Sequence, residues 1–173
     1  LPVGTRFLLP GPSRVAVSLY EITVSGELGH ALALSLQGMV AGYLLALLIG
    51  IPLGILMGIR RSVEYALDIH VNALYVTPLM ALVPIMIFWL GLGLVVRVVF
   101  ILIFCLFQIL ITTYHGAKSV PQRLVEIARS FCASERDLFT KVIIPHITPF
   151  IVTAARLGLG MALRGMVAAE ILI

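Results

Sequence analysis

Residues 38–59, GMVAGYLLALLIGIPLGILMGI, form an uncharged apolar stretch. Because about 20 apolar residues in a helix cross the roughly 30 Å hydrocarbon core of a bilayer, this stretch predicts a membrane-spanning helix. Arg60 and Arg61 follow it directly and mark a membrane surface. Three further stretches of apolar character predict three more spans: 73–96, 98–114 and 147–173. The expected fold class is an all-α polytopic membrane protein.

The composition excludes an ordinary soluble domain. Of 173 residues, 61% are hydrophobic and only 12% are charged, whereas a soluble domain carries about 25% charged residues. The net charge of +4 is too small and too dispersed for a nucleic-acid interface. The two cysteines, Cys105 and Cys132, predict no disulfide framework, and the four histidines lack the spacing of metal ligands. We therefore expect no metal site.

Basic residues set the expected orientation of the spans. The connector at residues 115–146 is rich in Lys and Arg, as is the end of the first span. The positive-inside rule places Arg60, Arg61 and this connector in the cytoplasm, and Arg97 outside. Residues 1–36 then form an outer segment, in which a proline-rich turn and a short interfacial helix lead into the first span.

Both chain ends suggest a piece of a longer protein. The chain starts at Leu1 rather than Met, and it stops at Ile173 within an apolar run. We expect residues 1–173 to belong to a single transmembrane domain that continues on both sides.

The connector has the pattern of two amphipathic helices. Pro121 suits the first turn of a helix, on which Leu124, Ile127 and Phe131 recur at helical spacing. Ser134 followed by Asp137 predicts the cap of a second helix that continues to Pro145. The apolar stripe must be buried either against the protein's own membrane domain or against a soluble partner. Periodicity alone leaves both alternatives open.

Residues 126–134 are EIARSFCAS and residues 142–145 are VIIP. These two parts of the connector resemble the EAA loop of ATP-binding-cassette importer permeases. The stretch at 77–93, together with the sequences RLGLG at 156–160 and AAE at 168–170, is similar to the nitrate, sulfonate and taurine subgroup of these permeases. The resemblance assigns coupling to an ATPase to nine consecutive residues: Glu126, Ile127, Ala128, Arg129, Ser130, Phe131, Cys132, Ala133 and Ser134.

The chain departs from the family pattern at two positions in this loop. Ile127 replaces the first Ala of the motif, and Cys132 replaces a Gly. In the family this Gly ends the first helix in a left-handed conformation, which is unfavourable for other residues by roughly 1 kcal/mol. We expect either a strained turn at Cys132 or a turn of another shape.

The resemblance implies a type I importer transmembrane domain in the bacterial cytoplasmic membrane. The implied partners are a second permease copy, identical or a close paralogue, two ATPase subunits and an extracytoplasmic substrate-binding protein. The sequence contains no phosphate-binding Gly-x-x-x-x-Gly-Lys-Ser/Thr motif. ATP and Mg are therefore expected on the partner ATPase, and this chain is expected to be no enzyme and to bind no cofactor. The implied substrate is a small oxyanion, a sulfonate or a heterocyclic vitamin precursor.

Candidate residues of the translocation pathway are Thr77, Pro78, Arg164 and Glu170. Ionisable groups are costly within a span, by about 2.5–3.5 kcal/mol on insertion scales, so they face a bundle interior or water. Arg164 and Glu170 either line the pathway or bind a neighbouring helix, and a structural role is the simpler interpretation. Arg156 is interpreted as a snorkelling side chain.

Other interpretations of the sequence remain open. Glu126 either anchors the connector to the ATPase or is a solvated helix acid. The chain as a whole is alternatively part of a secondary transporter or channel, which requires ligands for a coupling ion at mid-membrane. A third alternative is a membrane subunit that only assembles others.

Overall fold

The structure is a computed structural model that describes residues 11–173, so the predicted proline-rich turn lies largely outside the described residues. All regular elements in this part are helical, which confirms the all-α class. They are α1 (Pro12–Val24), α2 (Glu27–Ile59), α3 (Arg61–Val76), η2 (Leu79–Leu82), α4 (Val83–Leu90), α5 (Leu94–Lys118), α6 (Gln122–Ser130), α7 (Glu135–Asp137), η3 (Leu138–Ile143) and α8 (Ile144–Leu172).

The chain divides into two compact units, residues 1–37 and 38–173. In the first unit, α1 starts with a proline in its first turn, where the missing N–H costs no hydrogen bond. Gly26 adopts a φ of 79° and separates α1 from α2. The expected short helix before the first span is therefore present.

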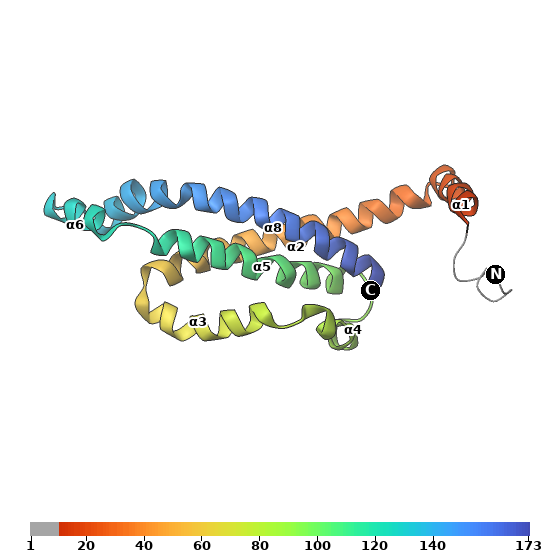
Figure 1. The fold of residues 1–173 in the computed structure, drawn as a ribbon, viewed down its shortest axis with the longest axis horizontal. Coiled ribbons are helices and arrows are strands. Elements are labelled where there is room, and N and C mark those ends of the chain that lie inside the picture. The colour runs from red at the N-terminus through yellow and green to blue at the C-terminus, as the bar shows by residue number, and fades with distance from the viewer. Residues whose placement is uncertain (1–10) are drawn as a thin grey trace. The chain divides into compact units, whose positions relative to one another are not determined.

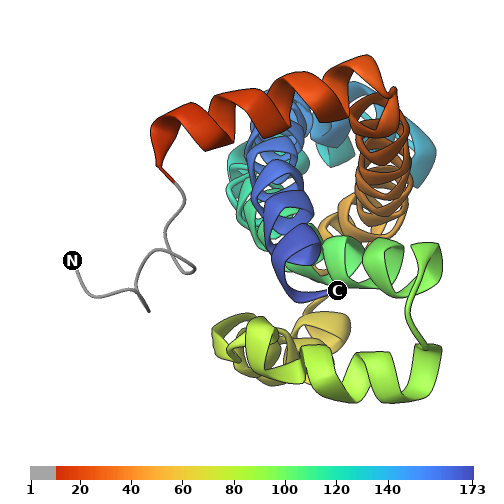
Figure 2. The same cartoon turned by 90° about the vertical axis from the view of Figure 1, so that its right-hand side faces the viewer.

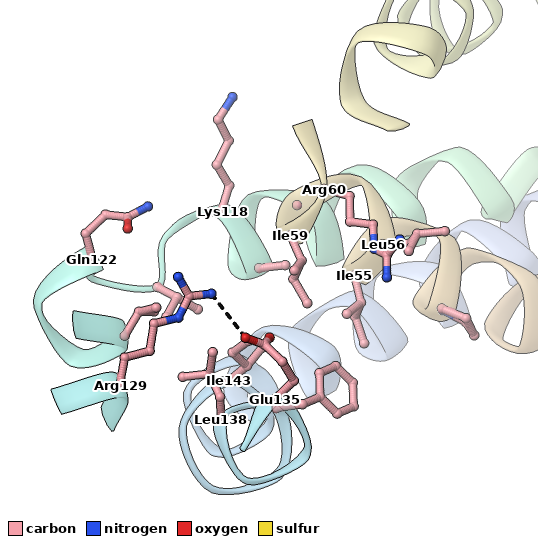
Figure 3. Close-up of a pocket in the computed structure, with 16 residues that line it drawn as sticks. Ile55, Leu56, Ile59, Arg60, Lys118, Gln122, Arg129, Glu135, Leu138 and Ile143 are labelled. Atoms are coloured by element: carbon pink, nitrogen blue, oxygen red, sulfur yellow. Dashed lines mark hydrogen bonds and ion pairs between the residues drawn. The ribbon is translucent and has the colours of Figure 1, made fainter. Parts of the chain in front are cut away.

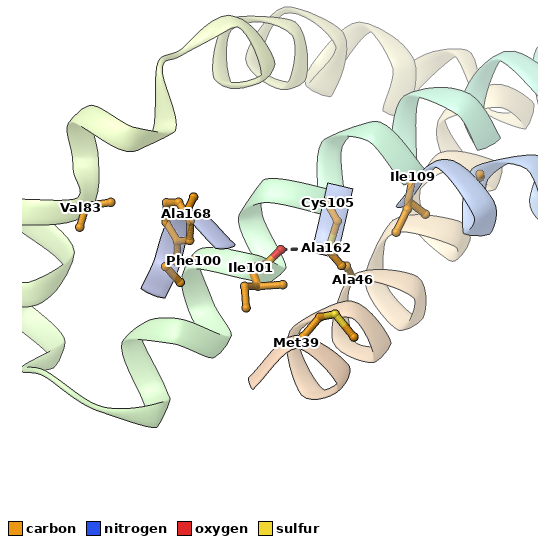
Figure 4. Packing of buried hydrophobic residues seen from close by; sticks show 11 residues of the cluster. Met39, Ala46, Val83, Phe100, Ile101, Cys105, Ile109, Ala162 and Ala168 are labelled. Carbon is orange, nitrogen blue, oxygen red and sulfur yellow. Dashed lines mark hydrogen bonds between the residues drawn. The ribbon is translucent and has the colours of Figure 1, made fainter. Parts of the chain in front are cut away.

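The second unit is a bundle around α5, which lies alongside α8 and has α3 on another side (Figures 1 and 2). Its core contains Phe100, Ile101 and Cys105 of α5. Small residues of the neighbouring helices, such as Ala46 of α2 and Ala162 of α8, face these side chains (Figure 4). The large residues of one helix thus fill the space left by the small residues of the others.

A row of glycines brings α2 close to α5. A Cβ atom at Gly42, Gly54 or Gly58 would lie 2.8 Å, 2.6 Å or 2.4 Å from the nearest atom of α5. Real Cβ contacts are not that short, so these positions admit only glycine without a shift of the helices. These glycines therefore set how closely α2 packs against α5.

The second crossing starts earlier than the expected span at 73–96. Helix α3 already begins at Arg61, and it is bent by 85° against residues Leu79–Leu90. Pro78 disfavours a helical conformation of the residue before it, and Thr77 is extended with a ψ of 131°. The described residues hold three helices that are long and apolar enough to cross a membrane, or up to four if the bent pair forms one span.

The last span also begins earlier than the expected residue 147. Residues Glu135–Leu172 form one helix through Pro145, so this proline does not end the second helix of the connector. A π-helical segment, η3, precedes Pro145. Its wider turns change the hydrogen-bond register at the point where proline lacks an N–H.

The two ends of the bundle carry different charged groups. Arg60, Lys118 and helix α6 lie at one end, whereas the start of α5 and the end of α8 lie at the other (Figure 1). There, Arg97 donates to Glu170 at 2.7 Å. Arg97 belongs to the first turn of α5 and not to a loop. Successive spans therefore run in opposite directions, as the positions of the basic residues predict.

Candidate functional site

The connector between α5 and α8 forms a sharp elbow at residues 131–134. At its corner Cys132 adopts a φ of 55°, and it is alone among the described non-glycine residues in having a positive φ. The N–H of Ala133 donates to the carbonyl of Ala128 at 3.1 Å, and the N–H of Cys132 donates to that of Arg129 at 2.9 Å. These two bonds are those of a Schellman motif, which closes a helix through a left-handed residue. Cys132 thus has the conformation that the family's glycine adopts easily.

The next helix starts with a side-chain cap. The hydroxyl of Ser134 accepts a hydrogen bond from the N–H of Asp137 at 3.1 Å and donates to its carboxylate at 2.6 Å. The carboxylate of Asp137 also pairs with Lys141 at 2.6 Å. The cap predicted from these residue types is confirmed, and it fixes the direction in which the chain leaves the elbow.

The Cys132→Gly substitution should stabilise the elbow. Glycine adopts a φ near 55° without steric cost, whereas cysteine pays roughly 1 kcal/mol. The Sγ atom of Cys132 is exposed, so no buried contact is lost. We expect a higher unfolding temperature for the detergent-purified permease, while Cys132→Ala should leave it unchanged. A lower unfolding temperature for Cys132→Gly would show that the thiol makes a stabilising contact.

Helix α6 has one face turned inward and one turned outward. Val125 and Ala128 pack against a buried cluster that contains Leu138 and Ile147. Ile127 and Phe131 remain 54% and 83% exposed. The apolar stripe predicted from the sequence is therefore left uncovered by the bundle, and a different pair of residues holds the helix in place.

The charged side chains of α6 are exposed, and one of them bonds across the elbow. Arg129 donates to Glu135 of α7 at 3.3 Å across the elbow, and both side chains are exposed. Glu126 is exposed, and its carbonyl accepts a bond from the hydroxyl of Ser130 at 2.9 Å. Exposed ion pairs contribute little to stability, so Arg129 and Glu135 orient the elbow more than they strengthen it.

A cavity of about 770 Å³ lies between this elbow and the ends of α2 and α5. Figure 3 shows Arg60, Arg129 and Glu135 among its lining residues, next to apolar side chains such as Ile55 and Leu138. The cavity separates α6 and α7 from the end of α2. The elbow is therefore supported mainly from the side of α5 and α8.

Hydrogen bonds and an ion pair join α3 to α5 at the same end of the bundle. The hydroxyl of Tyr114 donates to Glu64 at 2.6 Å, and Lys118 pairs with the same carboxylate. Further along, Tyr75 donates to Gln108 at 3.2 Å. Sequence reasoning missed these bonds because the partners lie far apart in the chain. The polar residues at helical spacing on α3 were the available signal.

The candidate pathway residues do not form one cluster. Thr77 and Pro78 lie at the break between α3 and η2, where the hydroxyl of Thr77 donates to the carbonyl of Ala73 at 2.8 Å. Glu170 of α8 pairs with Arg97 of α5. This contact is of the second kind considered for Glu170, binding to a neighbouring helix. Arg164 is exposed on α8. Among the described residues, no group of His, Cys, Asp or Glu could hold a metal ion.

A bundle of long apolar helices joined by an amphipathic connector is the architecture of a polytopic membrane protein. The chain belongs to the family of binding-protein-dependent transport system inner membrane components, whose family model matches residues 50–173. It is thus a multi-pass protein of the cytoplasmic membrane, from a family of transport permeases rather than enzymes. The predicted membership in the ATP-binding-cassette importer permeases is confirmed.

Individual relatives are similar over nearly the whole chain. The "Putative aliphatic sulfonates transport permease protein SsuC" of Escherichia coli is 36% identical over 168 residues, which cover 97% of this chain and 64% of the relative. The protein of the same name from Bacillus subtilis is 33% identical, with 99% and 62% covered. The taurine transport system permease protein TauC of Escherichia coli is 32% identical, with 99% and 64% covered. The chain thus spans less than two thirds of the length of these relatives.

Proposed function

We propose that this chain forms part of the permease subunit of an ATP-binding-cassette importer. The observation that carries the proposal is the uncovered apolar face of α6, held at one end of a membrane bundle by an ordered elbow. A bundle that bound this face itself would have no need of a partner there. An exposed apolar patch rimmed by charges is typical of a protein interface.

The proposed coupling residues are the nine from Glu126 to Ser134, which belong to the end of α6 and to the elbow. Ile127 and Phe131 insert into a groove of the ATPase, while Glu126 and Arg129 lie at its rim. ATP and Mg are bound by that ATPase and not by this chain. Closure of two ATPase subunits moves the elbows of two permease copies, and the bundles alternate between outward and inward access. A substrate-binding protein delivers the substrate from outside.

The proposed substrates are small sulfonates and related oxyanions. The names of two relatives, which refer to aliphatic sulfonates, and of a third, which refers to taurine, support this class. The break at Thr77 and Pro78 is the proposed irregular part of the pathway. Non-helical backbone at membrane depth is tolerated where it is buried in protein or lines a water-filled cavity.

Assembly with an ATPase tests this function. We expect the full-length protein, expressed with its ATP-binding-cassette partner and binding protein, to co-purify with that ATPase from membranes. In proteoliposomes a sulfonate-loaded binding protein should stimulate ATP hydrolysis and drive uptake of the sulfonate. The binding protein without ligand is the control. Uptake that persists without ATP would instead indicate a secondary transporter, and assembly without any uptake would indicate a purely structural subunit.

A further inference from the structure

Two arginines lie within the last membrane-spanning helix, on the side opposite to its packing surface. Arg156 and Arg164 stand about 12 Å apart along the axis of α8, about 18 Å and about 30 Å from its start at Ile144. At 100° per residue both lie within about 40° of Gly160 and far from the buried Gly158, which is about 160° from Gly160. Both arginines are exposed.

The described residues offer these two cations no acidic partner. The ion pairs in this part of the chain involve neither arginine. Arg164 donates only to the sulfur of Met161, at 3.8 Å, which is a weak acceptor. The nearby acid of α8, Glu170, is paired with Arg97. The face therefore carries two uncompensated positive charges at membrane depth.

The surface between the two arginines is open. A Cβ atom at Gly160 would meet no atom within 4 Å, in contrast to the glycines at which α8 packs, such as Gly158, where Ile109 would lie at 2.5 Å. An uncompensated arginine in contact with lipid is costly, and such residues normally face a partner protein or a water-filled path. The glycine leaves room for a small molecule between the two guanidinium groups.

We propose that Arg156, Gly160 and Arg164 form a face of α8 that lines the translocation pathway and binds the anionic group of the substrate at two successive positions. The proposal rests on the proposed importer function and names the residues that recognise the sulfonate or oxyanion. A guanidinium group donates two parallel hydrogen bonds to such a group. Since the two arginines stand about 12 Å apart along the helix axis, each offers a binding position of its own, and the substrate passes from one to the other.

Reversible charge replacement tests this proposal in the full-length permease, assembled with its ATPase and binding protein in proteoliposomes. Arg164→Cys should lower sulfonate uptake at least tenfold and raise its KM. Modification with a methanethiosulfonate that carries a quaternary ammonium group should restore much of the uptake. The reagent that carries a sulfonate group should not restore it, and excess substrate should slow both modifications. Arg156→Cys should behave in the same way.

Leu159→Cys is the matched control, since Leu159 lies between the two arginines along the helix but about 100° around it from Gly160 and is 42% exposed. It should transport normally and show no protection by substrate. The unsubstituted protein, treated with the same reagents, sets the baseline for Cys105 and Cys132.

Unchanged uptake and KM in Arg156→Gln and Arg164→Gln, in a complex whose unsubstituted form transports, would overturn this inference alone. Loss of assembly that the ammonium reagent repairs, without any protection by substrate, would also overturn it and assign the arginines to an acidic partner helix. Absence of transport by the unsubstituted complex would instead refute the importer function.

Discussion

Replacing Gly54 with valine should prevent stable accumulation of the protein in the membrane. A Cβ atom at this position would lie 2.6 Å from the carbonyl oxygen of Leu110 and 2.9 Å from the Cβ of Thr113. The nearest atom belongs to the backbone of α5, so it cannot move aside as a side chain can. Overpacking of this kind costs typically 1–3 kcal/mol, and valine adds two further methyl groups. We expect a loss of most folded protein in detergent extracts.

Gly29→Val is the matched control for this substitution. Gly29 also lies in α2, but a Cβ atom there would meet nothing within 4 Å. The Gly29→Val protein should accumulate to the same level as the unsubstituted protein. The measurement is the amount of monodisperse permease recovered by size-exclusion chromatography, with its unfolding temperature. Normal recovery of Gly54→Val would show that α2 and α5 are not in close contact at this point.

Phe131→Ala should release the ATPase from the membrane without unfolding the permease. Phe131 is 83% exposed, so the bundle loses little when its ring is removed. Full burial of one large apolar side chain in an interface contributes about 1.5–3 kcal/mol, which corresponds to a roughly tenfold to hundredfold weaker complex without it. We expect most of the ATPase to dissociate during purification, with a parallel loss of uptake.

Arg129→Ala separates this effect from a general disturbance of the elbow. The ion pair of Arg129 with Glu135 is exposed on both sides and contributes about 0–1 kcal/mol. The ATPase should therefore stay bound to this variant far better than to Phe131→Ala. Glu126→Ala should keep the complex assembled and uncouple hydrolysis from uptake. Full ATPase retention and uptake in Phe131→Ala would show that Phe131 does not contact the ATPase.

The local features of the connector could be predicted because they depend on neighbouring residues. The cap at Ser134 follows from a hydroxyl three residues before Asp137, and the position of Cys132 in the family pattern gives a strained left-handed turn as one of two expected shapes. Both are set by hydrogen bonds within one or two turns. Whether the bundle covers the apolar stripe could not be predicted from periodicity, because it depends on whether Ile127 or Ala128 faces the bundle.

The second crossing could not be predicted from apolar runs. Helix α3 carries Glu64 and Asp68, so the uncharged stretch begins well after the start of the helix at Arg61. The bundle accommodates Glu64 because Tyr114 and Lys118 of α5 bind its carboxylate. The polar residues at helical spacing on α3 indicate that this helix needs polar partners, but the identity of those partners is a property of the tertiary structure.

The helix from Glu135 to Leu172 is continuous and links the elbow to the far end of the bundle. At 1.5 Å per residue its 38 residues span about 57 Å, from the elbow to the far end of the bundle. A tilt of roughly 10° about its midpoint would swing each end by about 5 Å, in opposite directions. Arg164 and Glu170 belong to the same arm as the capped start at Ser134. A displacement of the elbow is thus carried through η3 and past Pro149 to the residues at the opposite end of the bundle.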